Sequence, residues 1–350
     1  MNTKVRDSNI ELLRIFSICG VIVLHYNGGF ALNSVAQGTV NHYFLLLLEA
    51  AFICAVDLFV LISGYFLCTT NSRKATKALE LVVQVMVIGV LQYLLTCLLS
   101  RTMPGLSGLV GAAIPNSYYV TLYLTLYLLS PYINIILRRI SDKQLGFLVA
   151  MCAILFSVWP TVLDSVFLAT GKNYNGMYPT TASGSQYGYS LLNFCLMYLI
   201  GAYLRRIEQP GKARWNMLGA GVCIGVIFVW QQYYESVALS YCNPFVILLA
   251  VFYFRLFKGL RFSSAPVNAL AKSTFTCFLL HTFFLRQIRI SDFANRPFPY
   301  LLGHIAISVP VIFLLCYLVW RVYDPVAKPV FRLLDQKLNK VNRLLSPPSE

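Results

Sequence analysis

Long apolar stretches alternate with short polar connections from one end of the chain to the other. Bounding the apolar stretches by turn signals predicts ten helices, each long enough to cross a hydrocarbon core of roughly 30 Å. They are predicted at residues 9–28, 42–69, 75–99, 118–137, 146–168, 189–206, 214–234, 237–257, 266–287 and 300–327. The pattern indicates an all-α, polytopic membrane helical bundle, because no soluble domain of useful size fits between the helices.

Composition supports the same class. Hydrophobic residues make up 58% of the 350 residues and charged residues 12%, and the mean hydropathy is +0.66. An ordinary soluble domain is about half apolar and roughly a quarter charged. We therefore expect a multi-pass protein of the cell membrane.

The basic residues are distributed unevenly, and their distribution predicts an orientation. Most of the 28 Lys and Arg residues lie near the two termini or in alternate connections. The other connections hold only Arg101, Lys172, Arg286, Arg289 and Arg296. Because cytoplasmic loops are enriched in Lys and Arg, both termini are predicted to be cytoplasmic. The formal charge of +15 is thus explained by topology, and nucleic acid is not an expected partner.

The last 22 residues differ from the rest of the chain. We divide the sequence into a membrane domain, residues 1–328, and a basic cytoplasmic tail, residues 329–350. The tail includes "VFRLLDQKLNKVNRLL", which predicts a short amphipathic helix on the membrane surface. The ten cysteines are scattered singly, without a CxxC pair, so neither a disulfide framework nor a metal site is expected.

The first predicted helix carries two ionisable residues on one face. Arg14 and His25 are eleven positions apart. In an α-helix this spacing rotates the side chain by about three full turns plus 20°, so both residues share one face and are separated by about 16 Å along the axis. A charge inside a membrane indicates a functional site by default. The structural alternatives are that Arg14 pairs with Glu11 or extends to the surface, and that His25 meets interfacial water.

The second predicted helix carries Glu49 and Asp57. Counting rise per residue from the outer ends places Asp57 at about the same depth as Arg14, roughly 21–22 Å down. This predicts an Arg14–Asp57 ion pair, either within the site or as a purely structural staple between two helices.

Five segments, in order, resemble one family. They are "RIFSICGVIVLH" with its Arg-x10-His spacing, "DLFVLISGYFL", "YLTLYLLSPYIN", "LMYLIGAYLRR" and "CFLLHTFF". Together they resemble the membrane-bound acyltransferase family 3, whose members O-acylate sugars, polysaccharides and lipid-linked glycans. The resemblance implies transfer of an acyl group, usually acetyl, from cytoplasmic acyl-CoA to a glycan hydroxyl on the outer side. Acyl-CoA would be a co-substrate, no cofactor would be bound, and polysaccharide-assembly proteins are possible partners.

Transfer to a sugar hydroxyl needs a base, and His25 is the first candidate because its ordinary pKa suits that role. It would act as general base, or would itself carry the acyl group in a two-step route. Glu49 is the nearest carboxylate by depth and is expected to fix the His25 tautomer. Arg14 would lie lower along the same face, on the route of the CoA arm.

Other cations are candidates for substrate contacts. Arg73, Lys74 and Lys77 are expected to bind CoA phosphates at the inner rim, unless they only set topology. His281, Arg286 and Arg289 are expected on the acceptor side, with Arg296 beside them; the alternatives are a core histidine and a tolerated basic loop. His42 and His304 are expected to face solvent near outer helix ends.

The longest connection on the predicted outer side has two interpretations, and two other functions are alternatives to acyl transfer. Residues 168–188 read "LATGKNYNGMYPTTASGSQYG", either a solvated loop or a lid that offers Tyr rings and amides to a sugar. A transporter or flippase is the main alternative function, although no paired Gly/Pro-broken helices occur in corresponding halves. A module that only senses or anchors explains the buried charges least well.

Overall fold

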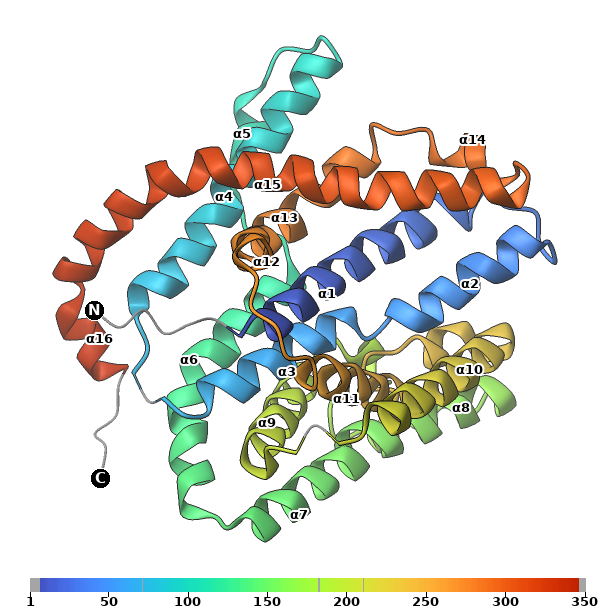
Figure 1. Ribbon diagram of the computed structural model, residues 1–350, viewed down its shortest axis with the longest axis vertical. Coiled ribbons are helices and arrows are strands. Elements are labelled where there is room, and N and C mark those ends of the chain that lie inside the picture. Colours follow the sequence, from blue (N-terminus) through green and yellow to red (C-terminus); the bar gives the residue numbers. More distant parts are fainter. Residues whose placement is uncertain (1–6, 71, 182, 210, 346–350) are drawn as a thin grey trace.

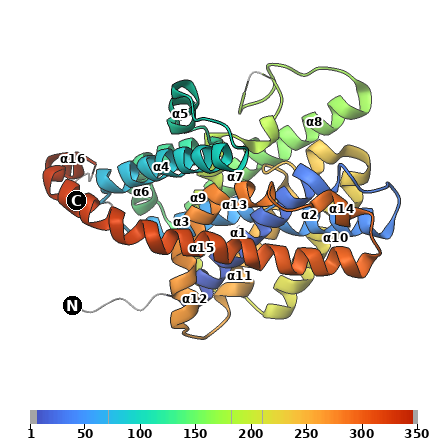
Figure 2. The ribbon, with the colours of Figure 1, turned by 90° about the horizontal axis from the view of Figure 1, so that it is seen from above.

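A computed structural model describes residues 7–70, 72–181, 183–209 and 211–345. The predicted cytoplasmic ends include residues 1–6 and 346–350, which lie outside these ranges. Within the described residues the protein is all-helical and contains no strand, as the sequence predicts (Figure 1). The first helix begins and the last helices end on the same side of the bundle (Figures 1 and 2).

Helix α1 (Ser8–Tyr26) is the centre of the bundle and continues through one π turn, Asn27–Ala31. It packs against α2 (Val40–Phe52), α3 (Ala55–Leu67), α11 (Pro244–Lys258) and α13 (Thr274–Leu285). Its side chains Leu13, Ile18 and Ile22 are completely buried. Because protein surrounds most of this helix, its polar side chains lie against other helices rather than lipid.

The second predicted helix is interrupted. It consists of α2 and α3, which are separated by a turn at Ile53 and Cys54. Hydrophobic residues continue through the turn, so the apolar pattern that predicted one helix gave no sign of the break. The turn places Asp57 in the first turn of α3, at the end of a helix where a carboxylate is electrostatically favoured.

The other helices surround this centre (Figure 1). They are α4 (Ala75–Leu99), α5 (Leu106–Ala113), α6 (Tyr118–Arg139), α7 (Asp142–Ala153), α8 (Trp159–Thr170), α9 (Leu191–Ile207), α10 (Ala213–Ala238), α12 (Ala265–Leu270), α14 (Ile290–Ala294), α15 (Phe298–Lys337) and α16 (Asn339–Leu344). A π turn, Ile154–Val158, joins α7 to α8. Short 3₁₀ turns occupy Gln186–Gly188 and Ala271–Ser273.

Seven helical segments of the described residues are long and apolar enough to cross a membrane. Each of the ten predicted segments is mainly helical, although the segments 42–69 and 237–257 are interrupted by turns. Helix α9 has 17 residues, α11 has 15 and α13 has 12. These shorter helices lie among the longer ones, so the seven long segments establish a multi-pass membrane protein. That the chain crosses the membrane ten times remains a prediction.

Helices α3 and α9 approach each other unusually closely at two glycines. A Cβ atom on Gly64 would lie 2.3 Å from the Tyr198 carbonyl oxygen, and one on Gly201 would lie 2.3 Å from the Leu61 carbonyl oxygen. Real Cβ atoms essentially never come so near to backbone. The glycines therefore allow two helix backbones to touch, which fixes α9 beside Asp57.

Helix α15 continues beyond the predicted start of the tail. Its 40 residues run through Pro329 to Lys337, so the amphipathic segment forms the end of α15 and the short α16. This end contacts the start of α4: the Thr76 hydroxyl donates to Asp335 at 2.8 Å, and the Ala75 amide donates to Asn342 at 2.8 Å. The predicted surface helix is thus joined to the membrane bundle.

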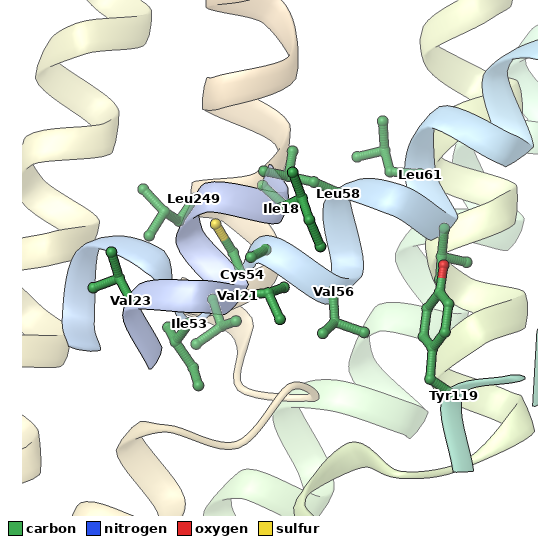
Figure 3. Close-up of a cluster of buried hydrophobic side chains, with 14 of the residues drawn as sticks. Ile18, Val21, Val23, Ile53, Cys54, Val56, Leu58, Leu61, Tyr119 and Leu249 are labelled. Carbon is green, nitrogen blue, oxygen red and sulfur yellow. The ribbon is translucent and has the colours of Figure 1, made fainter. Parts of the chain in front are cut away.

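Figure 3 shows the buried cluster that holds the central helices together. Ile18 and Val21 of α1 meet Cys54 and Val56 beside the α2–α3 turn, and Leu249 of α11 closes the cluster. Each of these side chains is at most 5% exposed. The cluster fixes α1 and α3 relative to each other, and it thereby positions their polar residues.

Candidate functional site

Two histidines from distant parts of the chain face each other. His25 lies in the last turn of α1 and His281 lies in α13. Their ring centroids are 4.9 Å apart and the planes are inclined by 49°. His25 retains accessible surface, whereas His281 is only 2% exposed. The pair therefore combines one reachable imidazole with one that protein encloses.

The hydrogen bonds of His281 define its tautomer. Its Nδ1 atom lies 3.0 Å from the Cys277 carbonyl oxygen, which can only accept, so Nδ1 carries the hydrogen. The Nε2 atom is buried and has no hydrogen-bond partner. A buried acceptor without a partner is costly and marks a place where a further donor is expected.

An aromatic wall extends from this pair to α6. Phe278 lies 6.2 Å from the ring of His281, and Tyr119 lies 4.8 Å from that of Phe278. Tyr123 stacks on Tyr119 at 5.8 Å and accepts a hydrogen bond from Ser63. The sequence indicated Tyr123 only as part of a family-like segment and did not indicate Tyr119, because these side chains approach the histidines through folding alone.

Arg14 and Asp57 do not form the predicted ion pair. The Arg14 guanidinium lies 3.8 Å from Glu11, which was the structural alternative. Asp57 is 1% exposed and accepts a 3.2 Å hydrogen bond from the Asn193 side chain. The prediction was wrong because rise per residue gives depth only, whereas the α2–α3 turn directs Asp57 toward α9.

Asn193 is a polar site residue that the sequence analysis missed. It is 1% exposed and lies in the first turn of α9. One Asp57 oxygen and the Asn193 side-chain oxygen have no hydrogen-bond partner. The only sequence signal is an amide inside the apolar run "LLNFCLMYLIG".

Glu49 does not contact His25 in the way we predicted. It is 7% exposed and interacts with Asn27, just after α1, and electrostatically with Glu235 of α10. Among the described residues no hydrogen bond joins Glu49 to His25. The two side chains do not meet because they lie on different sides of α1. His25 faces His281 of α13, whereas Asn27, just after α1, faces α2 and Glu49.

Arg73 has an internal partner for each part of its guanidinium. It is 2% exposed and donates to Ser130 at 2.7 Å, to the Leu67 carbonyl at 3.0 Å and to the Thr70 carbonyl at 3.0 Å. Asn134 donates to the same two carbonyls. Leu67 is the last residue of α3 and Thr70 lies just beyond it, so Arg73 caps the end of that helix.

The two lysines of the predicted inner rim are at the surface. Lys74 has a side chain 65% exposed and pairs with Asp335, and Lys77 has a side chain 52% exposed and pairs with Glu80 at 3.0 Å. Solvent-exposed ion pairs of this kind contribute little to the stability of the fold, so the lysines can exchange these partners for others. Unlike Arg73, both lysines can turn to meet an anionic ligand.

The outer arginines adjoin an apolar pocket rather than the histidine pair. Arg286 is exposed, Arg289 pairs with Asp292 at 3.9 Å, and the Arg296 guanidinium lies 5.1 Å above the Phe293 ring. Phe293 also stacks at 4.0 Å on His304. The pocket lies between the end of α13, α14 and the first half of α15.

Neither remaining histidine is simply solvent-facing. His304 is half-buried, and its Nδ1 atom lies 2.8 Å from the Tyr26 hydroxyl. His42 is half-buried at the start of α2 and accepts a long hydrogen bond, 3.4 Å, from the Gly38 amide. The solvent-facing prediction is therefore wrong for His304, because α14 folds its aromatic side chain over that ring.

A second pocket, of about 350 Å³, lies in the long connection after α8. Polar and aromatic side chains line it: Asp164, Asn173, Asn175, Tyr178, Gln186 and Tyr187. Gln186 and Tyr187 have positive φ, 53° and 55°, a strained backbone that often occurs at binding sites. Tyr187 lies 6.2 Å from Tyr189, which lies 4.3 Å from Tyr118 at the start of α6.

Comparison with known proteins gives one match. Residues 7–321 match the model of a family described as an acyltransferase domain. Neither curated proteins nor solved structures give a match. The matched range includes both histidines, the aromatic wall, the Asp57–Asn193 pair and every residue that lines the two pockets.

Proposed function

Because the chain belongs to the membrane acyltransferase family 3, we propose that it transfers an acyl group, most often acetyl, from acyl-CoA to a glycan hydroxyl. The acceptor is a sugar, polysaccharide or lipid-linked glycan at the outer side of the cell membrane. The observation that carries the proposal is the His25–His281 pair, with its accessible ring and its buried free Nε2 acceptor.

His25 acts as general base in this proposal. As the acceptor oxygen attacks the thioester carbonyl, the hydroxyl proton passes to a ring nitrogen of His25. A C–O bond forms, the C–S bond breaks, and the proton on His25 neutralises the departing CoA thiolate. In the two-step alternative His25 first takes the acyl group and then yields it to the acceptor.

His281 acts through His25. Its Nδ1–H is held by the Cys277 carbonyl, so the ring cannot rotate and its Nε2 lone pair stays fixed. Catalytic hydrogen bonds are often long before substrate binds and tighten afterwards. We propose that Nε2 then accepts an N–H hydrogen bond from His25, which orients the base as the third member of a catalytic triad does.

The acyl donor reaches the pair from the inner side. Arg14 lies on the same face of α1 as His25 and is bound to Glu11 only loosely, at 3.8 Å. It is therefore available to a polar part of the CoA arm. Lys74 and Lys77 are exposed cations that suit the CoA phosphates. We assign Arg73 to helix capping and to no direct contact with CoA.

The acceptor binds on the side of the polar pocket. Its Asp, Asn and Gln side chains suit hydroxyl groups, and its tyrosines offer flat faces to the apolar side of a sugar ring. Contacts between Tyr187, Tyr189 and Tyr118 connect this pocket with α6, whose Tyr119 belongs to the aromatic wall. These contacts support a continuous path from the pocket toward the histidines.

One assay tests the activity. Purified protein in detergent receives acetyl-CoA, with and without total cell-surface polysaccharide as acceptor, and free CoA is measured. Acceptor-dependent release of CoA, with acetyl esters on the polysaccharide, is the expected result. A transporter or flippase, the alternative function, would release no CoA. Reconstituted protein that moves glycan across vesicles without cleaving acetyl-CoA would replace our proposal.

A further inference from the structure

The larger pocket has no place in the acyl-transfer proposal. It has a volume of about 600 Å³ and lies between α13, α14 and α15. Apart from Gln287, His304, Ser308 and the Tyr300 hydroxyl, its lining is apolar: Phe284, Ile288, Phe293, Pro299, Gly303, Ile307, Val311, Ile312 and Leu315. Its volume is within the usual range for small-molecule sites, about 300–1,000 Å³.

The pocket opens along a helix face that meets lipid. Tyr300 is 58% exposed, Ile307 67% and Val311 46%, and all three line the pocket. They lie in the apolar half of α15, which belongs to one of the seven candidate membrane spans. In a bilayer, this surface borders hydrocarbon chains rather than water. The natural occupant is therefore a molecule with a long apolar part.

Cationic groups gather at one end of the same pocket. Arg286 and Arg289 flank Gln287 and Ile288, which line it, and Arg296 covers the Phe293 ring. Asp292 is the only acidic residue in this stretch, and it partly neutralises Arg289. An apolar groove with a net positive end matches a ligand that has a hydrocarbon chain and an anionic head.

We propose that this pocket binds an anionic glycerophospholipid of the surrounding bilayer. One acyl chain occupies the groove along α15, and the phosphate meets Arg296 together with Arg286 or Arg289. Guanidinium groups pair with phosphate oxygens through two parallel hydrogen bonds, which makes arginine well suited to this contact. Bilayer lipids are present in great excess, so even modest affinity fills the site.

The site is connected to the outer end of α1. His304 lines the pocket and shares a 2.8 Å hydrogen bond with the Tyr26 hydroxyl. Tyr26 is fully buried and follows His25 directly in the chain. A lipid in the pocket would hold α14 and α15 against this residue. Lipid binding itself does not depend on the proposed acyl transfer. Only the inference that the lipid supports the position of His25, through Tyr26, rests on the proposed function.

Native mass spectrometry of the full chain in detergent tests the binding. The probes are dioleoyl phosphatidylglycerol and dioleoyl phosphatidylcholine, added at equal concentrations. We expect one phosphatidylglycerol molecule to be retained about tenfold more tightly than phosphatidylcholine, because the choline cation of phosphatidylcholine offsets its phosphate charge beside the arginines. Ile307→Trp, which fills the groove, and Arg296→Gln, which removes the cation over Phe293, should each remove this preference.

Controls separate this site from general attraction of anionic lipid. Lys172→Gln removes a cation from the long connection after α8 and should leave retention unchanged. Val311→Trp is a second groove-filling variant if Ile307→Trp does not fold. The His25→Ala variant should bind like the unmodified protein, so a failure of acyl transfer does not affect the result.

Three outcomes would overturn the proposal. Equal retention of both lipids, or an unchanged preference in the groove and arginine variants, would show that the pocket does not select an anionic glycerophospholipid. Displacement of phosphatidylglycerol by a lower concentration of undecaprenyl phosphate would assign the pocket to a polyisoprenyl carrier instead.

Discussion

The imidazole of His281 lies 4.9 Å from that of His25, centroid to centroid, although most of the chain separates the two residues. One ring is accessible, and the other has a fixed tautomer and a free, buried Nε2 atom. In the mechanism that we propose, His281 orients the base.

His281 should therefore contribute to turnover more than to donor binding. In His281→Ala we expect kcat for acetyl-CoA-dependent acylation to fall about 100-fold, within the usual range for acid–base assistance. KM for acetyl-CoA should change little, because the ring does not lie at the inner rim. Steady-state CoA release measures both. A rise in KM at constant kcat would assign His281 to substrate binding.

The pH profile adds a readout that a merely structural histidine would not alter. If Nε2 of His281 accepts a hydrogen bond from His25, the acidic limb of kcat should shift in His281→Leu, because leucine offers the base no acceptor. An unchanged profile with normal kcat would leave His25 acting alone.

Arg73 should be essential for stability. Arg73→Ala removes the bond to Ser130 and one of the side-chain donors to each of the Leu67 and Thr70 carbonyls, which keep the bond from Asn134. Each hydrogen bond from a charged group contributes about 1.5–3 kcal/mol, so the thermal unfolding temperature in detergent should fall by several degrees. The matched control Lys74→Ala should unfold normally. A normal unfolding temperature together with a raised KM for acyl-CoA would return Arg73 to phosphate binding.

Asp57 should be coupled to Asn193 and not to Arg14. In double-mutant cycles of unfolding free energy, Asp57→Asn with Asn193→Ala should show a coupling of about 1 kcal/mol, and Asp57→Asn with Arg14→Gln should show almost none. Exchanging the charges of Arg14 and Asp57 should not restore folding. Restored folding in the charge-exchanged protein would instead indicate an Arg14–Asp57 ion pair.

The contact between α3 and α9 should depend on its glycines. Gly64→Ala places a methyl group against the Tyr198 carbonyl and should destabilise the fold by about 1–3 kcal/mol, the usual cost of overpacking. Gly221→Ala is the matched control, because nothing lies within 4 Å of a Cβ atom there. Unfolding in a graded detergent series compares them. Equal stability would mean that α3 and α9 can separate without cost.

Most of the helical architecture could be predicted from the sequence. Apolar runs give the positions of helices because each run must satisfy its backbone internally within the membrane. The interruption at Ile53 and Cys54 was missed because its residues are as apolar as their neighbours. The 40-residue α15 was divided at residue 328 because a change from apolar to basic composition does not by itself end a helix.

The candidate site was only partly predictable. His25 and His281 were each found by residue type and depth, but depth does not tell which way a side chain faces around its helix. The same lack of angular information produced the Arg14–Asp57 pair and the Glu49–His25 contact, neither of which forms. The Asn193–Asp57 and Arg73–Ser130 hydrogen bonds join residues far apart in the sequence, and no local pattern predicts such contacts.

Substitution of His25 tests the central claim most directly. His25→Ala is compared with His42→Ala, a half-buried histidine outside the proposed site, at equal membrane expression and with acetyl-CoA and polysaccharide acceptor supplied. The proposal predicts that acceptor-dependent release of CoA is abolished in His25→Ala and retained in His42→Ala. Substantial acetyl transfer by the His25→Ala protein would contradict it.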